Sequence, residues 1–61
     1  MSNLEEIMKN DCVALDGDML HNLFVVTDCD GNEYLTHSLS AAKRKFKERN
    51  KFYERNESTK L

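Results

Sequence analysis

The apolar positions at the start of the chain recur with the spacing of one helical face. They fall at i, i+3, i+4, i+8 and i+11: Leu4, Ile7, Met8, Cys12 and Leu15. Residues 2–5 fit the S-x-x-E capping box, in which serine and glutamate side chains satisfy free backbone N–H groups. The pattern predicts a helix over about residues 3–14, although Val13-Ala14-Leu15 is also compatible with a short strand. Asp16-Gly17-Asp18 then predicts a turn.

The middle of the chain has the pattern of a β-hairpin. Residues 19–27 are rich in apolar and β-branched side chains, and residues 33–37 return as a second strand. Asp30-Gly31 between them is a strong hairpin signal. A two-residue loop would place Asp28 opposite Glu33, an unfavourable pair of like charges. We therefore expect a longer loop with Gly31 in the left-handed region.

The last third of the chain predicts one long helix. Residues 39–55 contain no glycine or proline, and helix-forming residues predominate. Thr36, Ser38 and Ser40 are all competent to cap its N-terminus. An apolar stripe with one polar interruption runs along it: Leu39, Ala42, Phe46, Asn50 and Tyr53. Residues 56–61 predict a frayed polar tail.

These elements together predict a small single α+β domain over residues 1–55. Their order is α-β-β-α, with the antiparallel hairpin packed against the long basic C-terminal helix. An isolated two-stranded hairpin is marginal in water, so the helices must cover one of its faces. The other face, or a free strand edge, stays available to a partner.

Length and composition exclude several classes of protein. Two cysteines do not make the multi-disulfide framework of a small secreted domain. No apolar run approaches the roughly 20 residues of a membrane helix, and the first residues lack the regions of a signal peptide. We therefore expect a cytoplasmic protein that does not associate with membranes and whose two thiols are reduced.

No pattern in the chain predicts catalysis, a metal or a cofactor. With Asp28 as the first residue of an EF-hand loop, glycine falls at position 4 instead of position 6, and position 12 is Leu39. Soft zinc ligands occur without the close pairs of a zinc finger: Cys12, His21, Cys29 and His37. A cysteine with a histidine would lack an orienting group and oxyanion donors. We expect a protein that is not an enzyme.

Charge is divided unevenly along the chain. Residues 1–42 carry one basic and eight acidic side chains, whereas residues 43–61 carry eight basic and three acidic ones. Cations share one sector of the predicted helix, about 120° wide, beside the apolar stripe: Lys43, Arg44, Lys47, Lys51 and Arg55. Phe52 points well away from that stripe. Cations near a helix N-terminus oppose the macrodipole, and such departures from local rules tend to occur where function requires them.

The basic sector predicts a partner-binding site. Its residues are Lys43, Arg44, Lys47, Lys51, Phe52 and Arg55, and its expected partner is a protein with an acidic surface. An alternative is a nucleic-acid-binding regulator that uses the same helix. The pI of 5.6 favours a protein partner, because dedicated nucleic-acid domains usually have a pI above about 9. Two interpretations stay open beside these: a solvated helix that only aids solubility, and pairing of the oppositely charged halves, within the chain or in a structural homodimer.

Two short motifs resemble those of known proteins. Residues 30–34 read Asp-Gly-Asn-Glu-Tyr, and residues 39–43 read Leu-Ser-Ala-Ala-Lys. This arrangement of a hairpin turn and a basic helix resembles short bacteriophage accessory proteins. The resemblance implies an early phage protein that binds a factor in the host cytoplasm and alters its activity. It assigns no functional residues.

Overall fold

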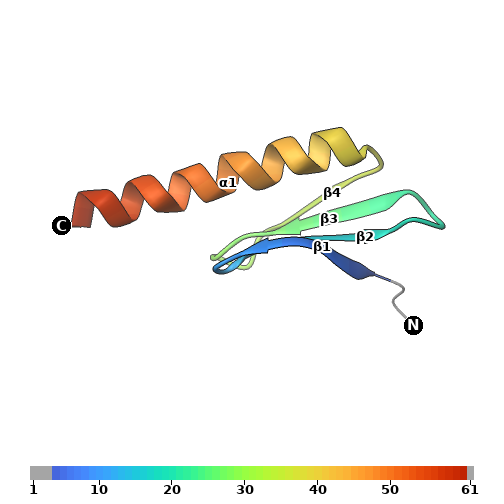
Figure 1. Ribbon diagram of the computed structural model, residues 1–61, viewed down its shortest axis with the longest axis horizontal. Helices are drawn as coiled ribbons and strands as arrows, with labels where there is room; N and C mark the ends of the chain where they lie inside the picture. Colours follow the sequence, from blue (N-terminus) through green and yellow to red (C-terminus); the bar gives the residue numbers. More distant parts are fainter. Residues whose placement is uncertain (1–3, 61) are drawn as a thin grey trace.

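The fold is a four-stranded antiparallel sheet followed by one helix. The computed structural model describes the backbone of residues 4–60 and the side chains of residues 4–54. Its elements, in order, are β1 (Glu5–Asn10), β2 (Val13–Asp18), β3 (Leu23–Thr27), β4 (Glu33–Thr36) and α1 (Leu39–Lys60). The strands form a meander in the order β1-β2-β3-β4, and α1 lies along one face of the sheet (Figure 1). The α+β class agrees with the prediction, but the predicted order α-β-β-α is wrong.

The predicted N-terminal helix is replaced by β1 and β2, and a β-bulge explains its misleading pattern. Glu6 pairs with Asp16, and Met8 pairs with Leu15, so Ile7 is one extra residue in β1. Ile7 and Met8 consequently both pack against the core, although they are neighbours in the sequence. Adjacent apolar side chains on one face imitate the i+3, i+4 spacing of a helix. The capping-box residues Ser2 and Asn3 lie outside the described residues.

The predicted turn at Asp16-Gly17-Asp18 is also wrong, because Gly17 lies inside β2. A Cβ added at Gly17 would lie 2.6 Å from Ile7 Cδ1 and 2.8 Å from Phe24 Cδ1. The glycine therefore marks close packing within the sheet. The chain instead reverses after Asp18, whose Oδ1 accepts a hydrogen bond from the backbone N–H of Leu20 at 3.1 Å.

The second hairpin and the helix start follow the sequence prediction, except that the first strand begins at Leu23 and residues 19–22 form a turn. Thr27 pairs with Glu33, and Gly31 has a φ of 86°, which confirms the longer loop. Of the three predicted caps, Ser38 is the residue that caps the N-terminus of α1. Its Oγ accepts a hydrogen bond from the backbone N–H of Ala41 at 3.3 Å, and its carbonyl accepts one from Ala42 at 3.0 Å.

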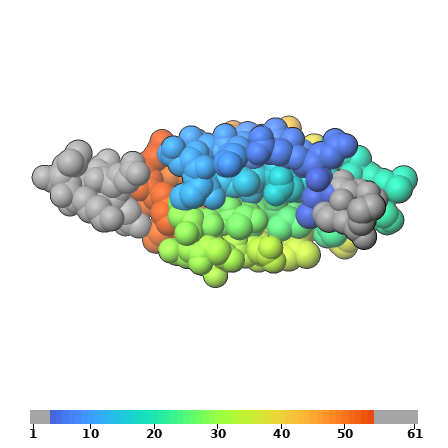
Figure 2. All heavy atoms as spheres, turned by 90° about the horizontal axis from the view of Figure 1, so that it is seen from below, coloured from blue at the N-terminus to red at the C-terminus, as the bar shows by residue number. Residues whose placement is uncertain are grey.

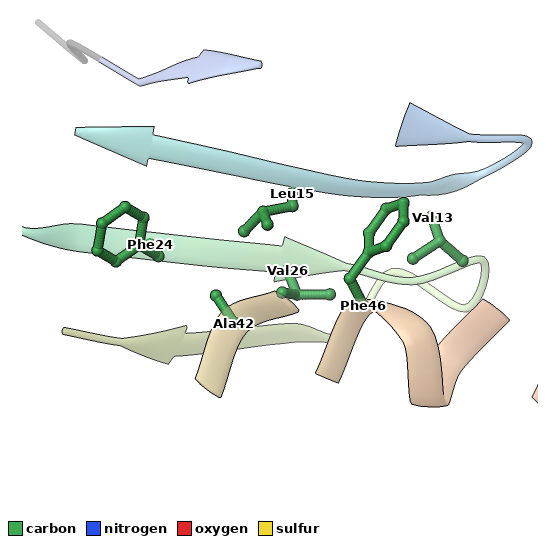
Figure 3. Packing of buried hydrophobic residues seen from close by; sticks show 6 residues of the cluster. All are labelled: Val13, Leu15, Phe24, Val26, Ala42 and Phe46. Carbon is green, nitrogen blue, oxygen red and sulfur yellow. The ribbon is translucent and has the colours of Figure 1, made fainter. Parts of the chain in front are cut away.

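The core lies between the sheet and the predicted apolar stripe of α1. Six buried side chains form it, two each from β2, β3 and α1 (Figure 3): Val13, Leu15, Phe24, Val26, Ala42 and Phe46. Leu39 and Tyr53 extend the stripe at its two ends and are partly buried. The polar interruption, Asn50, satisfies its amide within the helix, because Nδ2 donates to the carbonyl of Phe46 at 3.0 Å.

Cys12 and Cys29 form a disulfide, so the prediction of reduced thiols is wrong. The bond joins the β1–β2 turn to the β3–β4 loop, with the two Cα atoms 5.0 Å apart. The meander topology brings these two connections to the same end of the sheet, a closeness that the sequence spacing does not reveal. Within the described residues, α1 is too polar to cross a membrane.

Candidate functional site

The predicted basic residues lie on the face of α1 that points away from the sheet. The side chains of Lys43, Arg44, Lys47 and Lys51 are exposed, whereas Ala42 and Phe46 on the opposite side are buried. Among the side chains of residues 4–54, these four cations form no ion pair. We call them the basic face of α1. The side chain of Arg55, the fifth predicted cation, lies outside the described residues.

Phe52 lies at the border of this face and is partly held by its neighbours. Its side chain is 45% exposed. The Arg49 guanidinium stands 4.6 Å from its ring centre, and the Tyr53 ring packs edge-on against it at 5.1 Å. Phe52 therefore supplies a fixed apolar wall beside the basic face.

Other charges on the helix make the basic face a mixed surface. Glu48 and Glu54 are exposed among the cations. Lys45 pairs with Glu48 at 3.1 Å and sits 4.8 Å from the Tyr34 ring centre, so it turns toward the sheet. Cations interspersed with carboxylates suit a protein surface, with its own pattern of both signs, better than a continuous row of phosphates.

The structure also contains a buried polar cluster that the sequence prediction did not identify. The carboxylate of Asp28 is buried at the start of the β3–β4 loop. Oδ1 accepts from the backbone N–H groups of Asp30 at 3.0 Å and Asn32 at 2.9 Å. Oδ2 accepts from the side chains of Asn32 at 3.3 Å and Tyr34 at 3.2 Å. Asp28 thereby holds the loop in one conformation.

Arg49 links this loop to the helix. Its Nε lies 3.2 Å from Asp28 Oδ2, an ion pair without hydrogen-bond geometry, and Nε is buried with no hydrogen-bond partner among the described residues. Arg49 Nη2 donates to the Tyr53 hydroxyl at 3.4 Å, which itself donates to Asp30 Oδ2 at 2.8 Å. This chain of contacts fixes the rotation of α1 against the sheet. It therefore also fixes the outward direction of the basic face.

The surroundings of the cluster shift three pKa values. Burial raises the pKa of Asp28, but hydrogen bonds from Asn32, Asp30 and Tyr34 outweigh it and hold the pKa below its ordinary value. The hydrogen bond with Tyr53 raises the pKa of Arg49. Burial and the hydrogen bond to Asp30 raise the pKa of the Tyr53 hydroxyl. Both members of the ion pair are thus charged at neutral pH, and their role is to hold α1 in place.

Sequence signals for this cluster exist but are weak. Asp28 comes two residues before Asp30-Gly31, a position from which an aspartate side chain often caps loop N–H groups. Arg49 is the cation nearest the apolar stripe on the side of Tyr53. Neither signal says that the two residues meet, because their contact depends on how α1 is rotated on the sheet.

The acidic and basic surfaces of the molecule lie on opposite sides. Glu6, Asp16 and Glu33 lie on the sheet face away from α1, as their strand pairings show. The molecule measures 22 Å along its intermediate axis, the direction in which α1 is stacked on the sheet (Figure 1). The Debye length is about 8 Å at physiological ionic strength, so salt largely screens one surface from the other. The basic face of α1 therefore acts as an independent electrostatic surface.

The described residues hold no group of three or more His, Cys, Asp or Glu side chains placed to bind a metal ion. His21 is engaged with Asp18, its Nδ1 lying 2.7 Å from Oδ2, and His37 Nδ1 lies 2.9 Å from the carbonyl oxygen of Asn22. The four soft ligands noted in the sequence are thus used in a disulfide and in contacts with other residues of the fold. No family model matches the chain, and no similar curated protein or solved structure was found.

Proposed function

We propose that the protein is a small non-catalytic regulator that binds the acidic surface of another protein through the basic face of α1. The observation that carries this proposal is the orientation of Lys43, Arg44, Lys47 and Lys51. They lie on the outer side of a helix whose inner side is packed, and no carboxylate among the described side chains pairs with them. Such a surface attracts and orients an oppositely charged partner.

The neighbouring side chains support a protein partner. Lysine and arginine stems cover apolar surface while their charged ends stay in water, so the face can make apolar as well as ionic contacts. Phe52 adds an aromatic wall of the kind that carries binding energy at interfaces. The resemblance to bacteriophage accessory proteins extends the proposal: the partner is a host factor, whose activity the small protein alters.

The test is affinity purification with the wild-type chain and single charge reversals as baits. Lys47→Glu removes a cation from the basic face, and Lys9→Glu makes the same change in net charge on β1. We expect acidic proteins captured by the wild type to be retained by Lys9→Glu. They should be depleted at least about tenfold by Lys47→Glu, while the circular dichroism spectrum stays unchanged. Equal capture by the two variants would rule out this site.

Nucleic acid remains a second candidate, because the acidic surface lies on the far side of the molecule. The overall pI of 5.6 therefore says little about the potential at α1. This candidate predicts a gel shift of duplex DNA or RNA that weakens steeply between about 50 and about 200 mM salt. Absence of a shift at the lower salt concentration would remove it.

A further inference from the structure

The sheet face opposite α1 is a second candidate surface of the molecule. No other element covers it in the part of the chain that the structure describes, and Figure 2 shows it formed by the four strands side by side. One row of paired residues crosses all four strands, in the order Glu6, Asp16, Val25 and Leu35. We call this surface, centred on that row, the outer face of the sheet.

The outer face combines exposed apolar area with unpaired acidic groups. Leu35 is 63% exposed beside the buried Val25. Glu6 and Asp16 are direct cross-strand neighbours, an arrangement that destabilises a sheet. Neither carboxylate has an ion-pair partner among the described residues, although Lys9 lies two strand pairs away. A partner that brought cations to this row and apolar atoms to Leu35 would relieve both features.

The basic face of α1 carries cations and borders an aromatic side chain, the groups that would complement the outer face. It presents Lys43, Arg44, Lys47 and Lys51 along one helix, with the partly exposed Phe52 at its border. Cations opposite Glu6 and Asp16, with an aromatic side chain near Leu35, would match the acidic and apolar halves of the row. The same helix cannot reach this surface within one chain, because α1 is packed on the other side of the sheet.

We propose that the outer face of the sheet binds the basic face of α1 of a second copy. Such a contact is head-to-tail, so a pair of copies still has one unoccupied basic face and one unoccupied outer face. Further copies can bind to these two surfaces and build a ring or a longer chain. A standard interface buries about 800 Å² per partner. The whole molecule exposes 4641 Å², so one sheet face or one helix face is of suitable size for a weak, salt-sensitive contact. The proposal rests on the proposed function only in using the same helix face.

The test is sedimentation velocity of the full chain at low salt, from tens of micromolar to about 1 mM, a range suited to weak association. We expect the mean sedimentation coefficient of the wild type to rise with concentration and the rise to disappear at high salt. Glu6→Lys/Asp16→Lys and Lys47→Glu/Lys51→Glu should each weaken self-association at least about tenfold. An equimolar mixture of these two variants should recover it, because each then offers a surface complementary to the other.

A matched control separates the effect of the outer face on self-association from the effect of net charge. Glu5 is adjacent to Glu6 but pairs with Gly17 on the helix side of the sheet. Glu5→Lys should therefore associate like the wild type, whereas Glu6→Lys should not. If Glu6→Lys/Asp16→Lys does not fold, Glu33→Lys serves as the variant of the outer face instead.

Two results would overturn the proposal: a monomeric wild type at the highest concentration and low salt, or no recovery in the mixture of folded variants. Neither result affects capture of an acidic protein by the wild-type chain. Conversely, loss of that capture with retained self-association would contradict the proposed function alone.

Discussion

Arg49 Nε lies 3.2 Å from the buried Oδ2 of Asp28, which joins the middle of α1 to the loop between β3 and β4. This ion pair determines more than local stability. Because Arg49 is held against the sheet, the residues on the other side of the helix, including Lys47, are directed into solvent. The binding surface that we propose therefore depends on a contact within the fold.

Asp28→Asn should destabilise the protein strongly. The substitution keeps the shape of the side chain but removes the charge that faces the buried Nε of Arg49. An amide nitrogen in place of Oδ2 also cannot accept the hydrogen bonds from Asn32 Nδ2 and the Tyr34 hydroxyl. We expect the Tm to fall by more than about 5 °C in a thermal scan followed by circular dichroism. Asp30→Asn, at an exposed residue of the same loop, should cost clearly less. Equal losses would contradict a special role for Asp28.

Acid should destabilise the wild type through the same residue. The pKa of Asp28 in the folded state is below its ordinary value of 3.8, so its contribution to stability is present above that value. The contribution is lost as the pH falls through the folded-state pKa, because the unfolded chain binds the proton more readily. Urea midpoints measured between about pH 5 and about pH 2 should therefore fall less steeply for Asp28→Asn than for the wild type. Parallel curves would show that Asp28 does not titrate as described.

Reduction of the disulfide should lower the stability without changing the fold. Cys12 and Cys29 are 17 residues apart in the sequence, and a cross-link that closes a loop of this size contributes about 3 kcal/mol. Guanidinium unfolding with and without a reducing agent measures this contribution, with Cys12→Ser/Cys29→Ser as a variant that no longer responds to the reductant. An unchanged midpoint in the wild type would mean that the cross-link is not formed in solution.

Gly17→Ala should destabilise the sheet by overpacking. The new methyl group would meet Ile7 Cδ1 at 2.6 Å and Phe24 Cδ1 at 2.8 Å, at a cost of about 1–3 kcal/mol. Ile7→Val removes the nearer of these two atoms, so the double variant should recover part of the loss. Gly31→Ala is the control, because its cost comes from the backbone φ of 86° and not from a close contact. Ile7→Val should give Gly31→Ala no such recovery.

The second half of the fold was predictable from the sequence because its signals are local. The Asp-Gly loop, the serine cap and the apolar stripe of α1 each act over a few residues, and all are found in the structure. The first half was not predictable, because a bulge at Ile7 gives two strands the spacing of a helix. Asp11 also turns the chain with a φ of 55° where no glycine marks a turn.

The candidate site likewise has a part that local signals predict and a part that depends on contacts between distant elements. The basic sector of α1 was predictable, because its cations repeat on one side of a well-marked helix. The contact between Asp28 and Arg49, and the disulfide between Cys12 and Cys29, depend on how distant elements are placed. Helix rotation and meander topology decide those placements, and neither can be inferred from residue spacing in one chain.

The most direct test of the account is to map the contact surface of α1. The ¹⁵N-labelled protein would be titrated with the purified acidic protein that the wild type captures and Lys47→Glu loses, and amide shifts would be followed by NMR. We predict that the largest shifts fall on residues 43–51 of α1 and that they vanish at high salt. Shifts confined to the β1–β2 turn and the outer face of the sheet would contradict the claim that the basic face of α1 is the binding surface.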